Sequence, residues 1–250
     1  MEQCFAIILE LSAYWRTYLM RKKFGAVTGI DAAFTILGHD DFMKNNIRIK
    51  KEGDFQGCIG DLGWYCIRLA QIMYGGVGFG NLKSAQVFDW KLNEEGVPID
   101  ANCLVTFQSN DADMSEESNH KLSFHCSYLH PWHQRGGVCG TKRTVEVMGF
   151  VNPKDGPVSF QVRASDITAN QSECAEDVII PCEIPQITLM WRQFHEYCKV
   201  VEEREWTEVT PSDEVSALSE ISCKNQLVLD ALMESIQRSG EVVIFPLEKY

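Results

Sequence analysis

The stretch KLSFHCSY, residues 121–128, sets the expectation for the fold. Apolar and polar side chains alternate along it, and the apolar set is Leu122, Phe124, Cys126 and Tyr128. Successive side chains of a β-strand point to opposite faces, so a period of two is typical of a half-buried strand. The stretch therefore predicts a sheet with one face in the protein core.

Segments with the same alternation lie on both sides of this stretch. They span residues 88–92, 103–107, 143–151, 158–164 and 177–182. Turn-forming sequences separate them, among them NEEG at 93–96 and NPKDGP at 152–157. Many short strands with such turns favour two sheets packed face to face over an alternating strand and helix fold. We therefore expect an α+β chain built on an antiparallel, jelly-roll-like β-sandwich.

Helices are expected before and after the strand series. Helical periodicity and end signals predict helices over residues 2–22, 31–37, 61–74, 187–201 and 213–240, with a last strand over 242–245. No linker is long enough to divide the 250-residue chain. The sequence therefore predicts one domain, residues 1–250, with helices at both ends.

The N-terminal helix carries an apolar stripe, which is formed by Phe5, Ile8, Leu9, Trp15 and Leu19. Such a stripe packs either on its own domain or on a neighbouring subunit. In the second case residues 1–24 dock on the neighbour, and these five side chains are the interface anchors.

Composition and charge restrict the partners and the compartment. Lys and Arg number 23 against 35 Asp and Glu, a net charge of -12 that repels a phosphate backbone and argues against nucleic acid. The apolar run near the N-terminus is cut by Glu10, so it fits neither a signal peptide nor a membrane span. The ten cysteines include no CxxC pair, as expected for reduced core residues. We expect a cytoplasmic protein that does not enter a membrane.

One cluster of sulfur and imidazole side chains could hold a metal. Zinc would accept Cys126, His130, His133 and Cys139. Their spacing matches no familiar zinc finger, and Pro131 restricts the backbone between them. The alternative is an aromatic, hydrogen-bonded loop packed on the sandwich. We therefore assign no metal site, and zinc stays open.

Catalytic and cofactor motifs are incomplete. The glycine run at 75–80 has neither the GxGxxG order nor a following Lys-Ser/Thr pair, so a turn explains it better than a phosphate loop. Cys103 alternates with apolar residues, which predicts a core thiol with a raised pKa. We find no nucleophile elbow. The sequence therefore predicts no catalytic residue and no cofactor, with nucleotide binding left open.

The tripeptide His130-Pro131-Trp132, together with the helix expected at 187–206, resembles the polyhedrins of cypoviruses over the second half of the chain. This resemblance implies a jelly-roll-like sandwich, trimers packed into a crystalline lattice, and virus particles embedded in the cytoplasm of a host cell. It also implies dissolution in alkaline fluid. Nucleotide binding is associated with that family but falls on no identified residue here.

The leading hypothesis is therefore a non-enzymatic, self-assembling structural protein that resembles a viral occlusion-body matrix protein. Its partners would be further copies of itself and virus particles. A first alternative is a capsid-type protein or binding module of finite oligomeric state. A second alternative is a zinc- or cysteine-dependent enzyme.

Overall fold

A single mixed sheet is the centre of the computed structural model, which describes residues 24–74, 82–108, 119–151, 158–164, 175–180, 184–202 and 213–245. Its nine strands have the spatial order β8-β7-β6-β5-β1-β4-β3-β2-β9. They are β1 (Val27–Leu37), β2 (Leu82–Leu92), β3 (Pro98–Gln108), β4 (Asn119–Ser127), β5 (Leu129–Gly140), β6 (Arg143–Met148), β7 (Val158–Ala164), β8 (Ala175–Ile180) and β9 (Val243–Ile244).

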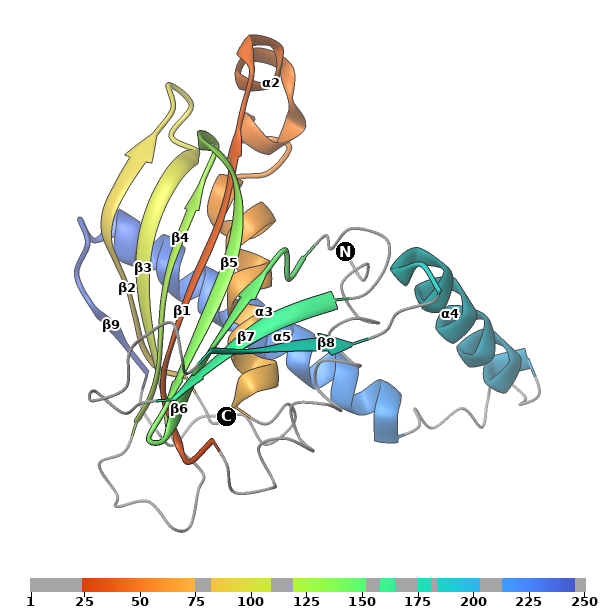
Figure 1. Ribbon diagram of the computed structural model, residues 1–250. Helices are drawn as coiled ribbons and strands as arrows, with labels where there is room; N and C mark the ends of the chain where they lie inside the picture. Colours follow the sequence, from red (N-terminus) through yellow and green to blue (C-terminus); the bar gives the residue numbers. More distant parts are fainter. Residues whose placement is uncertain are drawn as a thin grey trace.

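The centre of the sheet is formed by β5, β1 and β4, which lie side by side in Figure 1. β1 pairs in parallel with β4 and antiparallel with β5, and the other strand pairs of the sheet are antiparallel. β4 and β5 follow each other in sequence, yet β1 lies between them. The Thr35 hydroxyl donates to the Pro131 carbonyl at 2.6 Å and fixes the point where the chain crosses the end of β1.

Helices cover one face of this sheet. The helical segments are α2 (Asp40–Asn45), a 3₁₀ turn (Ile47–Ile49), a π-helical turn (Ile59–Gly63), α3 (Trp64–Met73), α4 (Gln186–Glu202) and α5 (Asp213–Gln237). Both α3 and α5 lie behind the sheet in the view of Figure 1, and they pack against its strands and against each other. No helix within these described segments is long and apolar enough to cross a membrane.

The alternation seen in the sequence separates a covered face from an open face. Along β3 the side chains of Ala101, Cys103, Val105 and Phe107 are fully buried against the helices. Their neighbours on the opposite face, such as Leu104, remain partly exposed. Close packing of helix on sheet also requires glycine, because a side chain at Gly136 of β5 would collide with Leu69 of α3.

The prediction of a jelly-roll-like sandwich is therefore wrong. The chain forms one mixed sheet, and helices rather than a second sheet bury its apolar face. A period of two shows that one face of a strand is buried, but it does not show which kind of layer covers that face.

Several elements agree with the sequence prediction and two do not. The helices at α3, α4 and α5 and the strand at β9 are confirmed. The helix predicted at 31–37 is wrong, because this segment is part of β1. The loop expected between Cys126 and Cys139 is β5 over most of its length. The interface residues Phe5, Ile8, Leu9, Trp15 and Leu19, and the glycine run at 75–80, lie outside the described residues.

Candidate functional site

The π-helical turn that opens α3 packs closely against its surroundings. Glycines recur at 57, 60 and 63. A Cβ on Gly60 would lie 2.7 Å from Gln56 Cβ, and one on Gly63 would lie 3.0 Å from the Phe124 ring. The backbone therefore approaches the sheet more closely than side chains would permit. π-helical turns inside helices occur frequently at functional sites.

Asp61 lies at the centre of this turn. One carboxylate oxygen is 2.9 Å from Arg48 Nε, and the other accepts a hydrogen bond from the Tyr128 hydroxyl at 3.1 Å. The Asp61 side chain keeps about a fifth of its surface exposed, at 21%. The guanidinium beside Asp61 has a raised pKa, because the hydrogen bond and the negative charge favour its protonated form. Asp61 is thus a fixed carboxylate that solvent can still reach.

Tyr128 holds this carboxylate from inside the protein. Its backbone N–H donates to Ile99 at 2.8 Å, and its carbonyl accepts from Gly38 N at 2.8 Å, so the ends of three strands meet at this residue. Its ring is fully buried and packs edge-on against Phe42, with ring centroids 5.0 Å apart. Burial raises the pKa of the Tyr128 phenol, and the charge of Asp61 raises it further. The phenol therefore stays protonated and acts as a hydrogen-bond donor.

A row of aromatic rings begins one helical turn after Asp61. Tyr65, four residues on, is half-buried and its ring centroid is 5.7 Å from that of Phe34. Phe34 in turn lies 5.8 Å from Trp132, which is 60% exposed. Tyr65 is the second residue of α3, and Asp61 lies in the π-helical turn just before this helix. The row provides an apolar surface that leads from solvent toward the helix start.

This arrangement suits chemistry at an oxygen atom that gains negative charge. A phenol can donate a proton, and a fixed carboxylate can orient a hydroxyl group. The structural alternative is that Asp61 only ties the 3₁₀ turn at Arg48 to α3.

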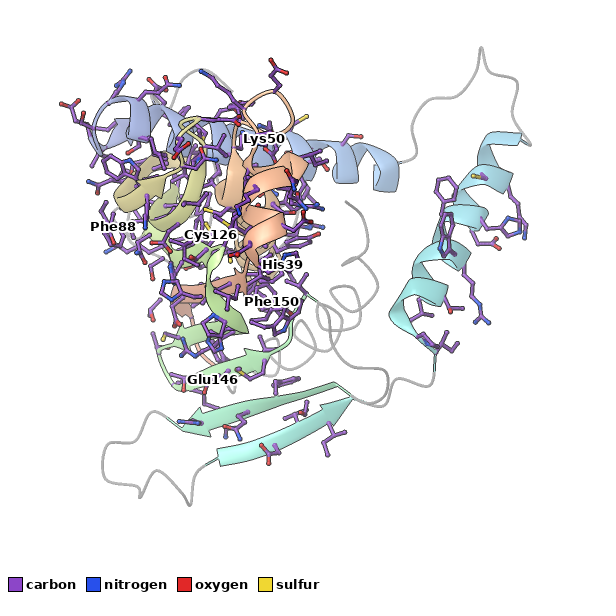
Figure 2. All side chains as sticks on the ribbon, turned by 90° about the horizontal axis from the view of Figure 1, so that it is seen from above. His39, Lys50, Phe88, Cys126, Glu146 and Phe150 are labelled. Carbon is purple, nitrogen blue, oxygen red and sulfur yellow. The ribbon has the colours of Figure 1, made fainter. Side chains whose placement is uncertain are left out.

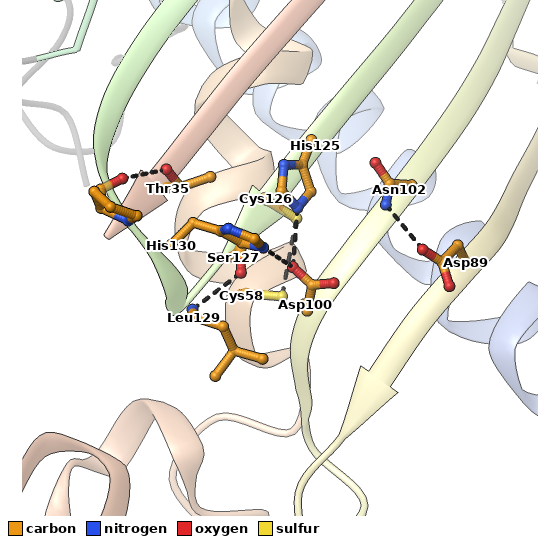
Figure 3. A network of polar contacts seen from close by, with 11 residues as sticks. Thr35, Cys58, Asp89, Asp100, Asn102, His125, Cys126, Ser127, Leu129 and His130 are labelled. Carbon is orange, nitrogen blue, oxygen red and sulfur yellow. Dashed lines mark hydrogen bonds and ion pairs between the residues drawn. The ribbon is translucent and has the colours of Figure 1, made fainter. Parts of the chain in front are cut away.

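The four candidate zinc ligands occupy different parts of the sheet. Cys126 is buried on the covered face, with its sulfur 3.9 Å from that of Cys58. His133 and Cys139 are exposed on β5, at positions six residues apart. His130 lies beside Asp100 and His125 instead, as Figure 3 shows.

The buried thiols line the interior between sheet and helices, where Figure 2 shows Cys126. Burial raises the pKa of Cys58, Cys66 and Cys103 well above that of a free thiol. Protonated, enclosed thiols are poor nucleophiles. These residues therefore serve as small apolar core residues.

Sequence reasoning missed the roles of Asp61 and Arg48. Asp61 is the first residue of the helix predicted at 61–74, and the sequence pattern gives Arg48 no role. The signal that could have identified them is the glycine spacing at 57, 60 and 63, which marks a helix start pressed against another backbone.

No protein-family model matches the chain. Among solved structures, KijD10, a 3-ketoreductase from Actinomadura kijaniata in complex with TDP-benzene and NADP, is similar with a TM-score of 0.62 and 17% identity over 91% of this chain and 59% of that one. An NAD-binding oxidoreductase from Klebsiella pneumoniae has a TM-score of 0.58 and 15% identity over 96% and 66%.

A third similar structure is a proposed NADPH-dependent oxidoreductase from Desulfitobacterium hafniense, with a TM-score of 0.62 and 17% identity over 93% of this chain and 60% of that one. The chain spans about three fifths of the length of these structures. At identities this low, the structural likeness establishes a shared fold and no more.

The comparison corrects the leading hypothesis. The resemblance to cypovirus polyhedrins is wrong, because the structures that share this fold over more than nine tenths of the chain are oxidoreductases. The prediction of a non-enzymatic viral matrix protein is wrong for the same reason. The prediction of no cofactor, which left nucleotide binding open, is also wrong, since the similar structures include a 3-ketoreductase in complex with NADP.

Proposed function

We propose that this chain is the substrate-binding unit of an oxidoreductase that reduces a carbonyl group at the expense of NADPH. The observation that carries the proposal is the likeness to a 3-ketoreductase over 91% of the chain. Free buried thiols such as Cys58 and Cys66 support a reducing, cytoplasmic setting.

The substrate carbonyl would lie at the start of α3. There the half-buried phenol of Tyr65 would donate a hydrogen bond to the developing alkoxide. Tyr65 would contact the carbonyl oxygen, while Asp61 would accept a hydrogen bond from a neighbouring hydroxyl group of the substrate. Trp132 would cover the substrate on its exposed side.

The described residues do not fit a dinucleotide. The turn after β1 leads into α2, whose first turn carries Asp40 and Asp41, and these carboxylates would repel a pyrophosphate. At the start of α3 the space beside the glycines is filled by protein atoms, among them those of Pro98 and Phe124. The nicotinamide cofactor would therefore be bound by protein outside the described residues, and it supplies only the hydride in this proposal.

Ligand binding to the purified chain tests the proposal. Polyhydroxylated ketones and nucleotide-linked keto sugars would be titrated while amide chemical shifts are recorded. We expect shift changes at residues 59–65 and binding weakened about tenfold or more by Tyr65→Phe or Asp61→Asn, because each removes a polar contact to the ligand. His133→Ala, on the open face, is the matched control and should bind normally.

Two results would contradict the proposal. One is the absence of carbonyl-ligand binding at millimolar concentrations, and the other is binding that the Asp61 and Tyr65 variants leave unchanged. NADPH consumption, measured with the bound ketone and protein isolated in its native assembly, then tests the redox step itself. Assemblies carrying Asp61→Asn should consume NADPH more slowly.

A further inference from the structure

The open face of the sheet carries a compact group of three metal-binding side chains, shown in Figure 3. Asp100 of β3, His125 of β4 and His130 of β5 each offer one ligand atom, and all three atoms lie within 4.8 Å of one another. The group lies on the side of the sheet away from α3 and α5. It is therefore independent of the site proposed for the carbonyl substrate.

Strand register brings these residues together. β3 and β4 pair Asp100 with Ser127 and Asn102 with His125, so Asp100 and His125 are diagonal neighbours on one face. The chain then passes across the end of β1 into β5, which places His130 beside Asp100 and His125. Both imidazoles direct Nε2 to a single oxygen of Asp100, at 2.9 Å from His125 and 3.7 Å from His130.

These separations suit a small cation. Ligand atoms about 2.1 Å from a tetrahedral zinc ion lie roughly 3.4 Å from one another. The two distances to Asp100 bracket that value. An ion pair alone explains the His125 contact, but it does not explain a second imidazole directed to the same oxygen.

The surroundings also support a metal site. The buried Ser127 hydroxyl accepts from Leu129 N at 3.0 Å and donates to Asp100, which fixes the carboxylate from behind. Such outer partners orient ligands and strengthen metal binding. His130 is about half exposed, so an ion has an open path from solvent.

We propose that Asp100, His125 and His130 form a binding site for a divalent transition-metal ion, with zinc as the preferred metal and water in the fourth position. Two imidazoles and one carboxylate suit zinc and cobalt, whereas magnesium and calcium prefer oxygen ligands. The site differs from the Cys126, His130, His133 and Cys139 set, with which it shares one residue.

Cobalt titration of the metal-stripped full chain tests this site. We expect one Co²⁺ per chain, with visible ligand-field absorption and no sulfur charge-transfer band, and displacement by Zn²⁺. His130→Ala and Asp100→Asn should each lower the affinity by about tenfold or more. His133→Ala and Cys139→Ala, on the same strand β5, are matched controls that should leave the affinity unchanged.

Three results would overturn the proposal. They are no Co²⁺ uptake by folded protein, affinity unchanged in His130→Ala, or a sulfur charge-transfer band that disappears in a cysteine variant. His130 is a half-exposed side chain, so its variant should fold, and circular dichroism would verify this. Binding of Mg²⁺ in place of Co²⁺ would also contradict the assignment.

Discussion

The two faces of the sheet use the same strands for different purposes. On the covered face β3 and β4 present an unbroken set of buried apolar side chains, among them Phe107 and Leu122. On the open face the same strands present Asp100 and His125, held by hydrogen bonds and ion pairs. The difference shows that one face of the sheet is used for the core, which leaves the other face available for polar chemistry.

The largest expected effect is seen when the same Leu→Ala substitution is made once on each face. Leu122 is fully buried on the covered face, and Leu104 is 38% exposed on the open face of the neighbouring strand. Leu122→Ala should lower the free energy of unfolding by about 2–5 kcal/mol, because it leaves a cavity. Leu104→Ala should cost less than about 1 kcal/mol. Urea denaturation measures both, and equal losses would refute the distinction between the faces.

High pH should lower the free energy of unfolding through the buried phenol of Tyr128. Tyr128→Phe should cost about 1–2 kcal/mol at neutral pH, since Asp61 loses a hydrogen bond. The raised pKa means that the folded protein keeps this proton while the unfolded chain releases it above about pH 10. Wild-type stability should then fall by up to about 1.4 kcal/mol per pH unit for this group.

Tyr128→Phe has no phenol proton to lose. The difference in stability between this variant and wild type should therefore narrow above about pH 10. Urea denaturation at neutral pH and at two alkaline pH values measures the change. A deficit that stays constant across this range would show that Tyr128 ionises equally in both states. Tyr74, whose pKa burial also raises, contributes to both proteins alike and serves as an internal control.

The smallest expected effect is on the open face, at low pH. Burial raises the pKa of Asp100, but hydrogen bonds from Ser127 and His125 lower it by more, so the net pKa lies below its ordinary value. The ionised carboxylate therefore stabilises the fold above the unfolded pKa of about 4, and this contribution is lost as the pH falls through the folded value.

Metal-free Asp100→Asn should thus be about 1 kcal/mol less stable than wild type near neutral pH, and this deficit should narrow at an acidic pH below about 4. Thermal unfolding at the two pH values measures this. The variant Asp89→Asn, which removes the charge of a nearby carboxylate that accepts a hydrogen bond from the Asn102 amide at 3.2 Å, is the control with a smaller expected change.

Most strands and the later helices could be predicted, because their periodicity reflects burial that the structure confirms. β1 could not be predicted, because the apolar residue Ala33 occupies a position on the open face and so interrupts the alternation of apolar and polar residues. β5 was obscured by proline and glycines, yet Gly136 is needed where Leu69 packs closely. The covering layer was also unpredictable, because periodicity carries no information about which element packs on a face.

The candidate sites depend on strand register, which the sequence does not reveal. Asp100 and His125 are 25 positions apart and become neighbours only through the pairing of β3 with β4. Arg48 meets Asp61 through the path of the chain around α3. Single residues of such sets look like ordinary surface charges until the topology is known.

The position of β1 also bears on how the chain is made. Ile30 pairs with Leu122 and with Val138, so an early strand finds both neighbours only among residues that follow it by about a hundred positions. During synthesis the segment 27–37 leaves the ribosome long before either neighbour exists. Until then this segment cannot form its native strand pairs. Closing such long loops also slows folding. The centre of the sheet can therefore form only after both β4 and β5 have been made.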